Sequence, residues 1–113
     1  MLDRAPRSIE FCGSSRADLR RFPLDARREA GLQLFLVQQG DDPDDWKPIN
    51  VGEGVREIRI REKSGAYRVM YVAKFADAIY VLHCFQKKTQ KTAPRDFDLA
   101  KRRYKELVRE LCR

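Results

Sequence analysis

The sequence predicts an α+β domain in which a small twisted antiparallel sheet carries two N-terminal helices and a C-terminal helix. Three observations predict it: apolar residues recur at helical spacing in residues 14–40, the period changes to two in residues 55–85, and helical spacing returns after residue 94. The 113 residues suffice for a single domain over residues 1–113. We expect the helices to pack on one face of the sheet and to leave the other face open.

Two helices are predicted before residue 41. The first begins near Ser14 and Ser15, because an acid follows at the spacing of a capping box. The second has Pro23 in its first turn and ends at Gly40. Its core-facing residues recur at helical spacing: Phe22, Ala26, Ala30, Leu34 and Val37.

Residues 41–54 have no consistent period and contain two prolines and two glycines. This composition is typical of a long surface connection. We expect Trp46 to anchor it to the core and its acidic side chains to be solvated.

Three antiparallel strands are predicted next. Residues 55–61 alternate, with Ile58 and Ile60 on one face and charged residues on the other. Gly65 favours a tight turn into a strand over residues 66–73, and the apolar run 79–85 is typical of a central strand. Pro94 opens the final helix, whose apolar stripe includes Phe97, Ala100, Tyr104 and Leu107.

Charge points to a polyanionic partner. The chain has 24 Lys and Arg against 17 Asp and Glu, a net charge of +7, and a pI near 9.6. Residues 86–113 alone carry ten basic and four acidic side chains. No apolar run approaches the 20 residues of a membrane span, and the first ten residues lack the apolar block of a secretory signal. We therefore expect a cytoplasmic protein.

Two arginines on the predicted hairpin are the first site candidates. Arg59 and Arg68 could point to the same side of the sheet, and their forked donors match a phosphate. Arg61 lies on the same face of its strand as Arg59. The alternative is that these are solvated strand residues, some of them paired with carboxylates such as Glu57 across the strands.

The second candidate is the polar segment that leaves the last strand. Residues 86–92 hold Lys87, Lys88, Thr89 and Lys91, which could contact a nucleic-acid backbone. The alternative is an ordinary solvated loop.

His83 is the third candidate. Its unperturbed pKa near 6.5 suits proton transfer, but a histidine in an apolar strand can equally be a hydrogen-bonded core residue. The three cysteines are far apart and form no CxxC pair, so neither a disulfide framework nor a zinc site is expected. The sequence contains no P-loop, no GxGxxG and no Ser-His-Asp order, which argues against hydrolase triads and nucleotide-driven motors.

Four segments together resemble the phage-derived, HigB-like group of the RelE/ParE toxin superfamily. They are DWKP at 45–48, GVREIRI at 54–60, GAYRVMY at 65–71 and VLHCFQKKTQKT at 81–92. The similarity covers nearly the whole chain. It implies the same fold that the periodicity predicts.

The resemblance also implies a function: a type II toxin that enters the ribosome and cuts mRNA, restrained by an antitoxin, often one with a helix-turn-helix domain. Such nucleases need no metal or other cofactor, since the 2′-OH of the RNA attacks the adjacent phosphate. By position, Arg68 would stabilise the pentacovalent phosphate, Arg59 would assist, and Lys87 or Lys88 would neutralise the leaving 5′-oxygen. Glu57 would be the general base or an ion-pair partner of Arg59.

A different function class stays open. The superfamily includes ParE, which acts on gyrase, so the chain could be a ParE-like topoisomerase inhibitor or an inactive phage remnant that only binds an antitoxin. The basic segment favours RNA over gyrase.

Overall fold

Five strands form one mixed sheet in a computed structural model that describes residues 6–112. Their order across the sheet is β1-β5-β4-β3-β2, so the first strand lies beside the last. Along the chain the elements are β1 (Ser8–Phe11), α1 (Ser15–Arg20), α2 (Leu24–Gln38), β2 (Trp46–Pro48), β3 (Val55–Glu62), β4 (Gly65–Val72), β5 (Ala78–Lys87) and α3 (Pro94–Leu111). The predicted α+β class is confirmed.

The three predicted strands form the centre of the sheet. β3 and β4 are antiparallel and are joined by a tight turn at Gly65, whose φ of +140° disfavours any residue with a side chain. β5 pairs with β4 on one side and β1 on the other, and its first eight residues are all buried. An irregularity between Met70 and Tyr71 shifts the β4–β5 register.

Two edge strands are absent from the sequence prediction. β1 runs parallel to β5, pairing Ser8 with Ala78 and Phe11 with Val81, so the sheet is mixed and not wholly antiparallel. β2 lies in the segment predicted to be irregular and pairs Trp46 with Ile58. Strands of four and three residues are too short to show a period, which is why the sequence did not reveal them.

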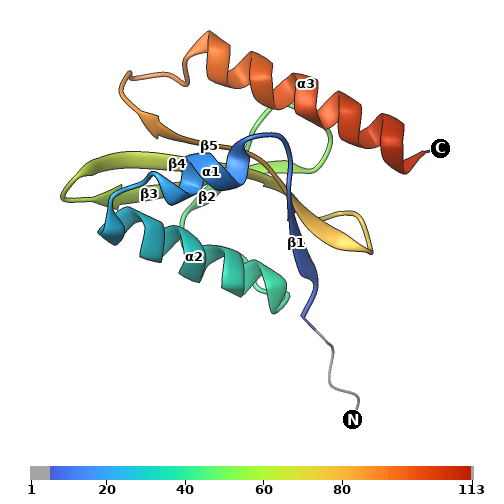
Figure 1. Cartoon of the computed structure of the whole chain (residues 1–113), viewed down its shortest axis with the longest axis horizontal. Coiled ribbons are helices and arrows are strands. Elements are labelled where there is room, and N and C mark those ends of the chain that lie inside the picture. Colours follow the sequence, from blue (N-terminus) through green and yellow to red (C-terminus); the bar gives the residue numbers. More distant parts are fainter. Residues whose placement is uncertain (1–5, 113) are drawn as a thin grey trace.

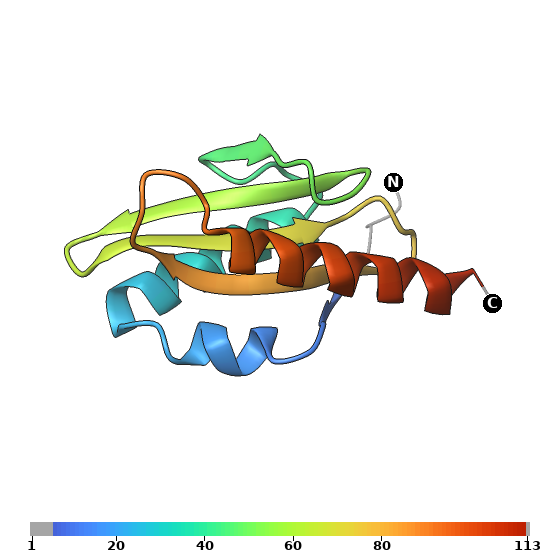
Figure 2. The same cartoon turned by 90° about the horizontal axis from the view of Figure 1, so that it is seen from above.

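Helices cover both faces of the sheet, which corrects the expectation of a single covered face. Figure 1 shows α1 and α2 on one side and α3 on the other, and Figure 2 shows α3 lying over the sheet from above. The reason is that the central strands are apolar on both faces. One buried core joins α1 and α2 to residues such as Ile58 and Val69, and a second joins α3 to Met70, Val72 and Leu82.

The helix starts follow the sequence with one difference in detail. α1 begins after Ser14, but the Ser14 hydroxyl donates to the Asp18 carboxylate at 2.8 Å and caps no backbone N–H. α2 begins directly after Pro23, and Gly40 beyond its end has a φ of +90°. Residues 1–5, part of the segment predicted not to be a secretory signal, lie outside the described residues. No helix within residues 6–112 is long and apolar enough to cross a membrane.

Candidate functional site

The β3–β4 hairpin places four charged side chains on the sheet face that α3 partly covers. Glu57, Arg59 and Arg61 alternate along β3, and Arg59 is the direct cross-strand partner of Arg68 on β4. Phe85 of β5 stands opposite Arg68 on the other side. Three neighbouring strands therefore fix the backbone positions of the site.

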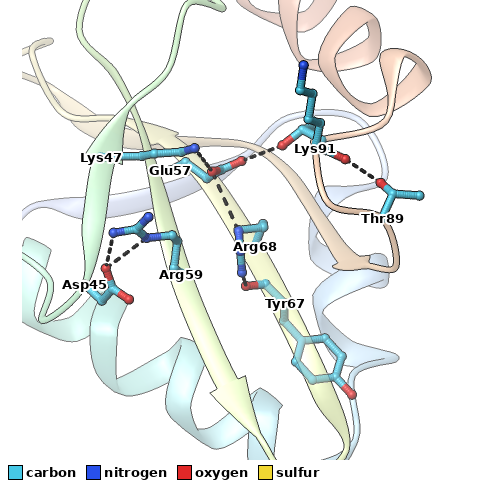
Figure 3. A network of polar contacts seen from close by, with 9 residues as sticks. Asp45, Lys47, Glu57, Arg59, Tyr67, Arg68, Thr89 and Lys91 are labelled. Carbon is cyan, nitrogen blue, oxygen red and sulfur yellow. Dashed lines mark hydrogen bonds and ion pairs between the residues drawn. The ribbon is translucent and has the colours of Figure 1, made fainter.

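The two arginine side chains part after leaving the sheet, as Figure 3 shows. Arg59 turns to Asp45, and its Nε and Nη2 lie 2.9 Å and 2.8 Å from one carboxylate oxygen. The Arg59 backbone N–H also donates to the Asp45 carbonyl oxygen. Two expectations are therefore wrong. Arg59 pairs with Asp45 and not with Glu57. The acidic side chains of residues 41–54 are not simply solvated, because Asp42 also forms an ion pair, with Arg56 at 2.9 Å.

Arg68 and Glu57 form a buried ion pair at the centre of the site. Their side chains are 8% and 1% exposed, and Arg68 Nε lies 3.7 Å from Glu57 Oε1. Lys47 Nζ of β2 lies 3.8 Å from the same oxygen, and the Thr92 hydroxyl donates to Glu57 Oε2 at 3.3 Å. In Figure 3, Glu57 accordingly lies between Lys47 and Arg68, with Lys91 beyond it. The carboxylate thus ties three separate elements together.

This pair is held by charge and not by a hydrogen bond. A distance of 3.7 Å is too long for a hydrogen bond, and both Glu57 Oε1 and Arg68 Nε are buried without a hydrogen-bond partner. Arg68 instead donates from Nη1 to the carbonyl oxygen of Tyr67 at 3.0 Å. Burial lowers the pKa of Arg68, with Glu57 acting in the opposite direction and Arg59 adding to the decrease. The Nε of Arg68 is therefore an unused donor that is buried beside the Glu57 carboxylate.

Lys87, the last residue of β5, adds a second cation near Arg68. Burial lowers its pKa, and the positive charge of Arg68 lowers it further. Lys88 is exposed and borders a hollow of about 270 Å³ between the end of β5 and the start of α3. Phe85, Lys87, Thr89 and Arg95 also line this hollow.

The loop over residues 88–93 is ordered by contacts with its own backbone and with β3. Thr89 donates its hydroxyl hydrogen to the carbonyl oxygen of Lys91, and Thr92 donates to Glu57. The Lys91 side chain is exposed, as is Arg61 near the hairpin turn. The predicted RNA-contacting residues Arg61, Thr89 and Lys91 therefore surround the site without entering it.

His83 is built into the packing between β5 and α3. It is 5% exposed, its Nε2 lies 2.7 Å from Asp96 Oδ1, and its ring stacks on Phe85 with centroids 4.9 Å apart. Its Nδ1 is buried without a partner. Among the candidates only Glu57 is more buried than His83.

Sequence reasoning missed three residues that complete the site: Asp45, Lys47 and Thr92. Lys47 and Glu57 are cross-strand partners, so recognising β2 would have placed them together. Thr92 is separated from Glu57 by 35 residues and had no signal beyond its membership of the basic segment. Within residues 6–112, no three His, Cys, Asp or Glu side chains are grouped as a metal site would require.

The arrangement is suited to binding an anion. Lys47, Arg68 and Lys87 surround one carboxylate, giving a local excess of positive charge on rigid strands. A phosphodiester could accept hydrogen bonds from Arg68 and Lys87, and the hollow that Lys87 lines is large enough for part of a nucleotide.

A family model described as phage-derived protein Gp49-like (DUF891) matches residues 17–105, from α1 into α3. No curated protein matches the chain.

Proposed function

Since the chain belongs to the Gp49-like family of phage-derived proteins, a RelE-like toxin family of toxin–antitoxin systems, we propose that it is a HigB-like toxin that cleaves mRNA on the ribosome. The observation that supports this most directly is that neighbouring strands hold Arg68 and Lys87 close together around the Glu57 carboxylate, with the charge of Arg68 lowering the pKa of Lys87. Its partners are the ribosome, mRNA and an antitoxin.

In the proposed reaction, the 2′-oxygen of a nucleotide attacks the adjacent phosphorus and the bond to the 5′-oxygen breaks, leaving a 2′,3′-cyclic phosphate. Arg68 stabilises the charge that builds on the phosphoryl oxygens, because its donors are preorganised in a place of low dielectric constant. Lys87 protonates the departing 5′-oxygen, since a lowered pKa makes its ammonium a better acid. The proton of the 2′-OH passes to water.

Glu57 has a positioning role in this proposal. Its side chain is 1% exposed and lies behind Arg68, so the substrate does not reach it while Thr92 is in place. It holds Arg68 by charge and holds the 88–93 loop by a hydrogen bond. Arg59 is occupied by Asp45, so it reaches a phosphate only after that ion pair opens.

Induced expression of Arg68→Ala tests the proposal. We expect this variant to lose growth inhibition and to leave mRNA intact when 5′ ends are mapped after induction. Arg109→Ala, in the last turn of α3, is the matched control and should remain toxic with in-frame cuts. A folded, fully active Arg68→Ala protein would contradict the assignment, and toxicity of the unchanged chain without any mRNA cuts would identify a binding module such as a topoisomerase inhibitor.

A further inference from the structure

The outer face of α2 carries an exposed apolar stripe that the proposed nuclease does not use. Leu24, Leu32 and Phe35 are 50%, 51% and 53% exposed, whereas Ala26, Ala30, Leu34 and Val37 on the inner face are buried. At 100° per residue, the three exposed residues fall within one quarter of the helix circumference, opposite the buried set. The helix thus has two apolar faces, of which the protein covers one.

Gly31 lies at one edge of the same stripe, between Leu24 and Leu32 along the helix. A Cβ atom built on it would have no heavy atom within 4 Å, so nothing inside residues 6–112 requires a glycine there. Glycine inside a helix is unfavourable by about 1 kcal/mol relative to alanine. An exposed glycine next to Leu32 and one turn before Phe35 is expected where the backbone of another molecule approaches closely.

The charges on the outer face identify the chemistry of that molecule: at 100° per residue, Arg28 falls between Phe35 and Leu32 within the stripe, and Arg27 falls beside it. Arg27 and Arg28 are exposed, and no carboxylate of the described residues forms an ion pair with them. They lie near the helix N-terminus, where cations are disfavoured by the helix dipole. The exposed Arg20 of α1 adjoins them, since its carbonyl oxygen accepts a hydrogen bond from Arg27. A second copy of this chain would bring like charges together, and an apolar stripe is a poor surface for RNA.

We propose that the outer face of α2 is a docking site for an amphipathic helix of a partner protein. Its apolar residues would pack on Leu24, Leu32 and Phe35, and its acidic side chains would meet Arg28 within the stripe and Arg27 beside it. Gly31 allows the two helix backbones to approach each other. The identity of this partner as the antitoxin rests on the proposed function, but the surface itself does not. A helix docked there would leave the site around Arg68 open, because α2 covers the opposite face of the sheet (Figure 1).

Fluorescence anisotropy with a stapled helical peptide of about 18 residues tests the proposal. The probe has leucines along one face and glutamates on the flanks, and a second peptide carries lysines in place of the glutamates. We expect the glutamate peptide to bind the full chain and Phe35→Ser to weaken binding by about tenfold or more. Leu111→Ser, at an exposed apolar residue of α3, is the matched control and should bind like the unchanged chain.

Gly31→Leu gives the sharper measurement. The substitution adds apolar area and helix propensity, so a surface that binds the peptide only by non-specific apolar contact would bind it more tightly. Close backbone approach predicts the reverse, a loss of about tenfold with unchanged circular dichroism. The double variant Arg27→Glu, Arg28→Glu should prefer the lysine peptide.

Four results would overturn the proposal: equal binding of both peptides, tighter binding by Gly31→Leu, self-association abolished by Phe35→Ser in sedimentation, and displacement of the peptide by poly-uridine RNA. Self-association that Phe35→Ser abolishes would show that a second copy of the chain occupies this face. Displacement by poly-uridine would show that an RNA occupies it. Because the variants lie away from Arg68, these results are independent of the mRNA cleavage assay.

Discussion

Removing the charge of Glu57 tests the physical basis of the site. Glu57→Gln keeps the shape of the side chain but leaves Arg68, 8% exposed, as a buried cation without an anion. Breaking a buried pair by removing one partner costs about 3–5 kcal/mol. Glutamine keeps an acceptor for Thr92, and the ion pair has no hydrogen bond to lose, so we expect a loss of about 2–4 kcal/mol in the free energy of unfolding.

The matching changes complete a double-mutant cycle. Arg68→Met should also destabilise the protein, because it leaves the buried carboxylate with only the half-exposed Lys47. The double variant buries two neutral side chains of similar volume and should return to within about 1 kcal/mol of the unchanged protein. The coupling energy, which is the sum of the two single losses minus the loss of the double variant, should then be at least about 3 kcal/mol.

Urea unfolding followed by the fluorescence of Trp46, the single tryptophan, measures all four proteins. With an m-value of about 1–3 kcal/mol/M, the single variants should shift the midpoint by roughly 1–2 M. A double variant that is less stable than either single variant, or a Glu57→Gln loss below about 0.5 kcal/mol, would refute the reasoning. Either result would mean that the charges do not depend on each other.

Three further predictions concern other groups. Burial lowers the pKa of Lys87 in the folded protein, so between that lowered pKa and 10.5 the unfolded chain binds more protons than the folded one. The free energy of unfolding should therefore rise with pH across this window. Urea unfolding of Lys87→Met at several pH values should not show this rise. Gly65→Ala should destabilise the β3–β4 hairpin by about 1–2 kcal/mol in urea unfolding, because Gly65 has a φ of +140° and the new Cβ would stand 2.8 Å from the Gln86 side chain; an unchanged midpoint would disprove it. In thiol titration of the native protein, the exposed Cys112 should react first, while Cys84, whose pKa is raised by burial, should react only on unfolding; early loss of Cys84 would show that the core opens locally.

The sequence predicted the elements whose stabilisation is local. The alternation of β3 and the glycine turn set the hairpin register, and that register alone puts Arg59 opposite Arg68. The sequence also places the starts of two helices from residues at those positions: α3 begins at Pro94, and α1 begins at Ser15, after Ser14. Patterns of this kind involve only a few neighbouring residues and can be recognised in the sequence alone.

The features that the sequence did not predict depend on contacts between segments that are far apart in the chain. β1 is stabilised by parallel pairing with β5, about 70 residues later, and its four residues carry no signal of their own. Side-chain packing decides which carboxylate each arginine meets. Asp45, directly before β2, binds Arg59, and the carboxylate of Glu57 faces Arg68. Likewise, the period of α3 shows which side of the helix is apolar but not which face of the sheet it covers.

The placement of α2 and α3 on opposite faces of the sheet has a consequence for how the protein can change over generations. The exposed residues on the outer side of α2 belong to neither buried core, and the Arg68–Glu57 pair lies on the opposite face of the sheet. Substitutions in one group should therefore be energetically independent of the other. A lineage could therefore exchange one binding specificity while its chemistry stays constant. Chimeras that combine the outer α2 residues of one relative with the hairpin of another should fold and keep both parental properties.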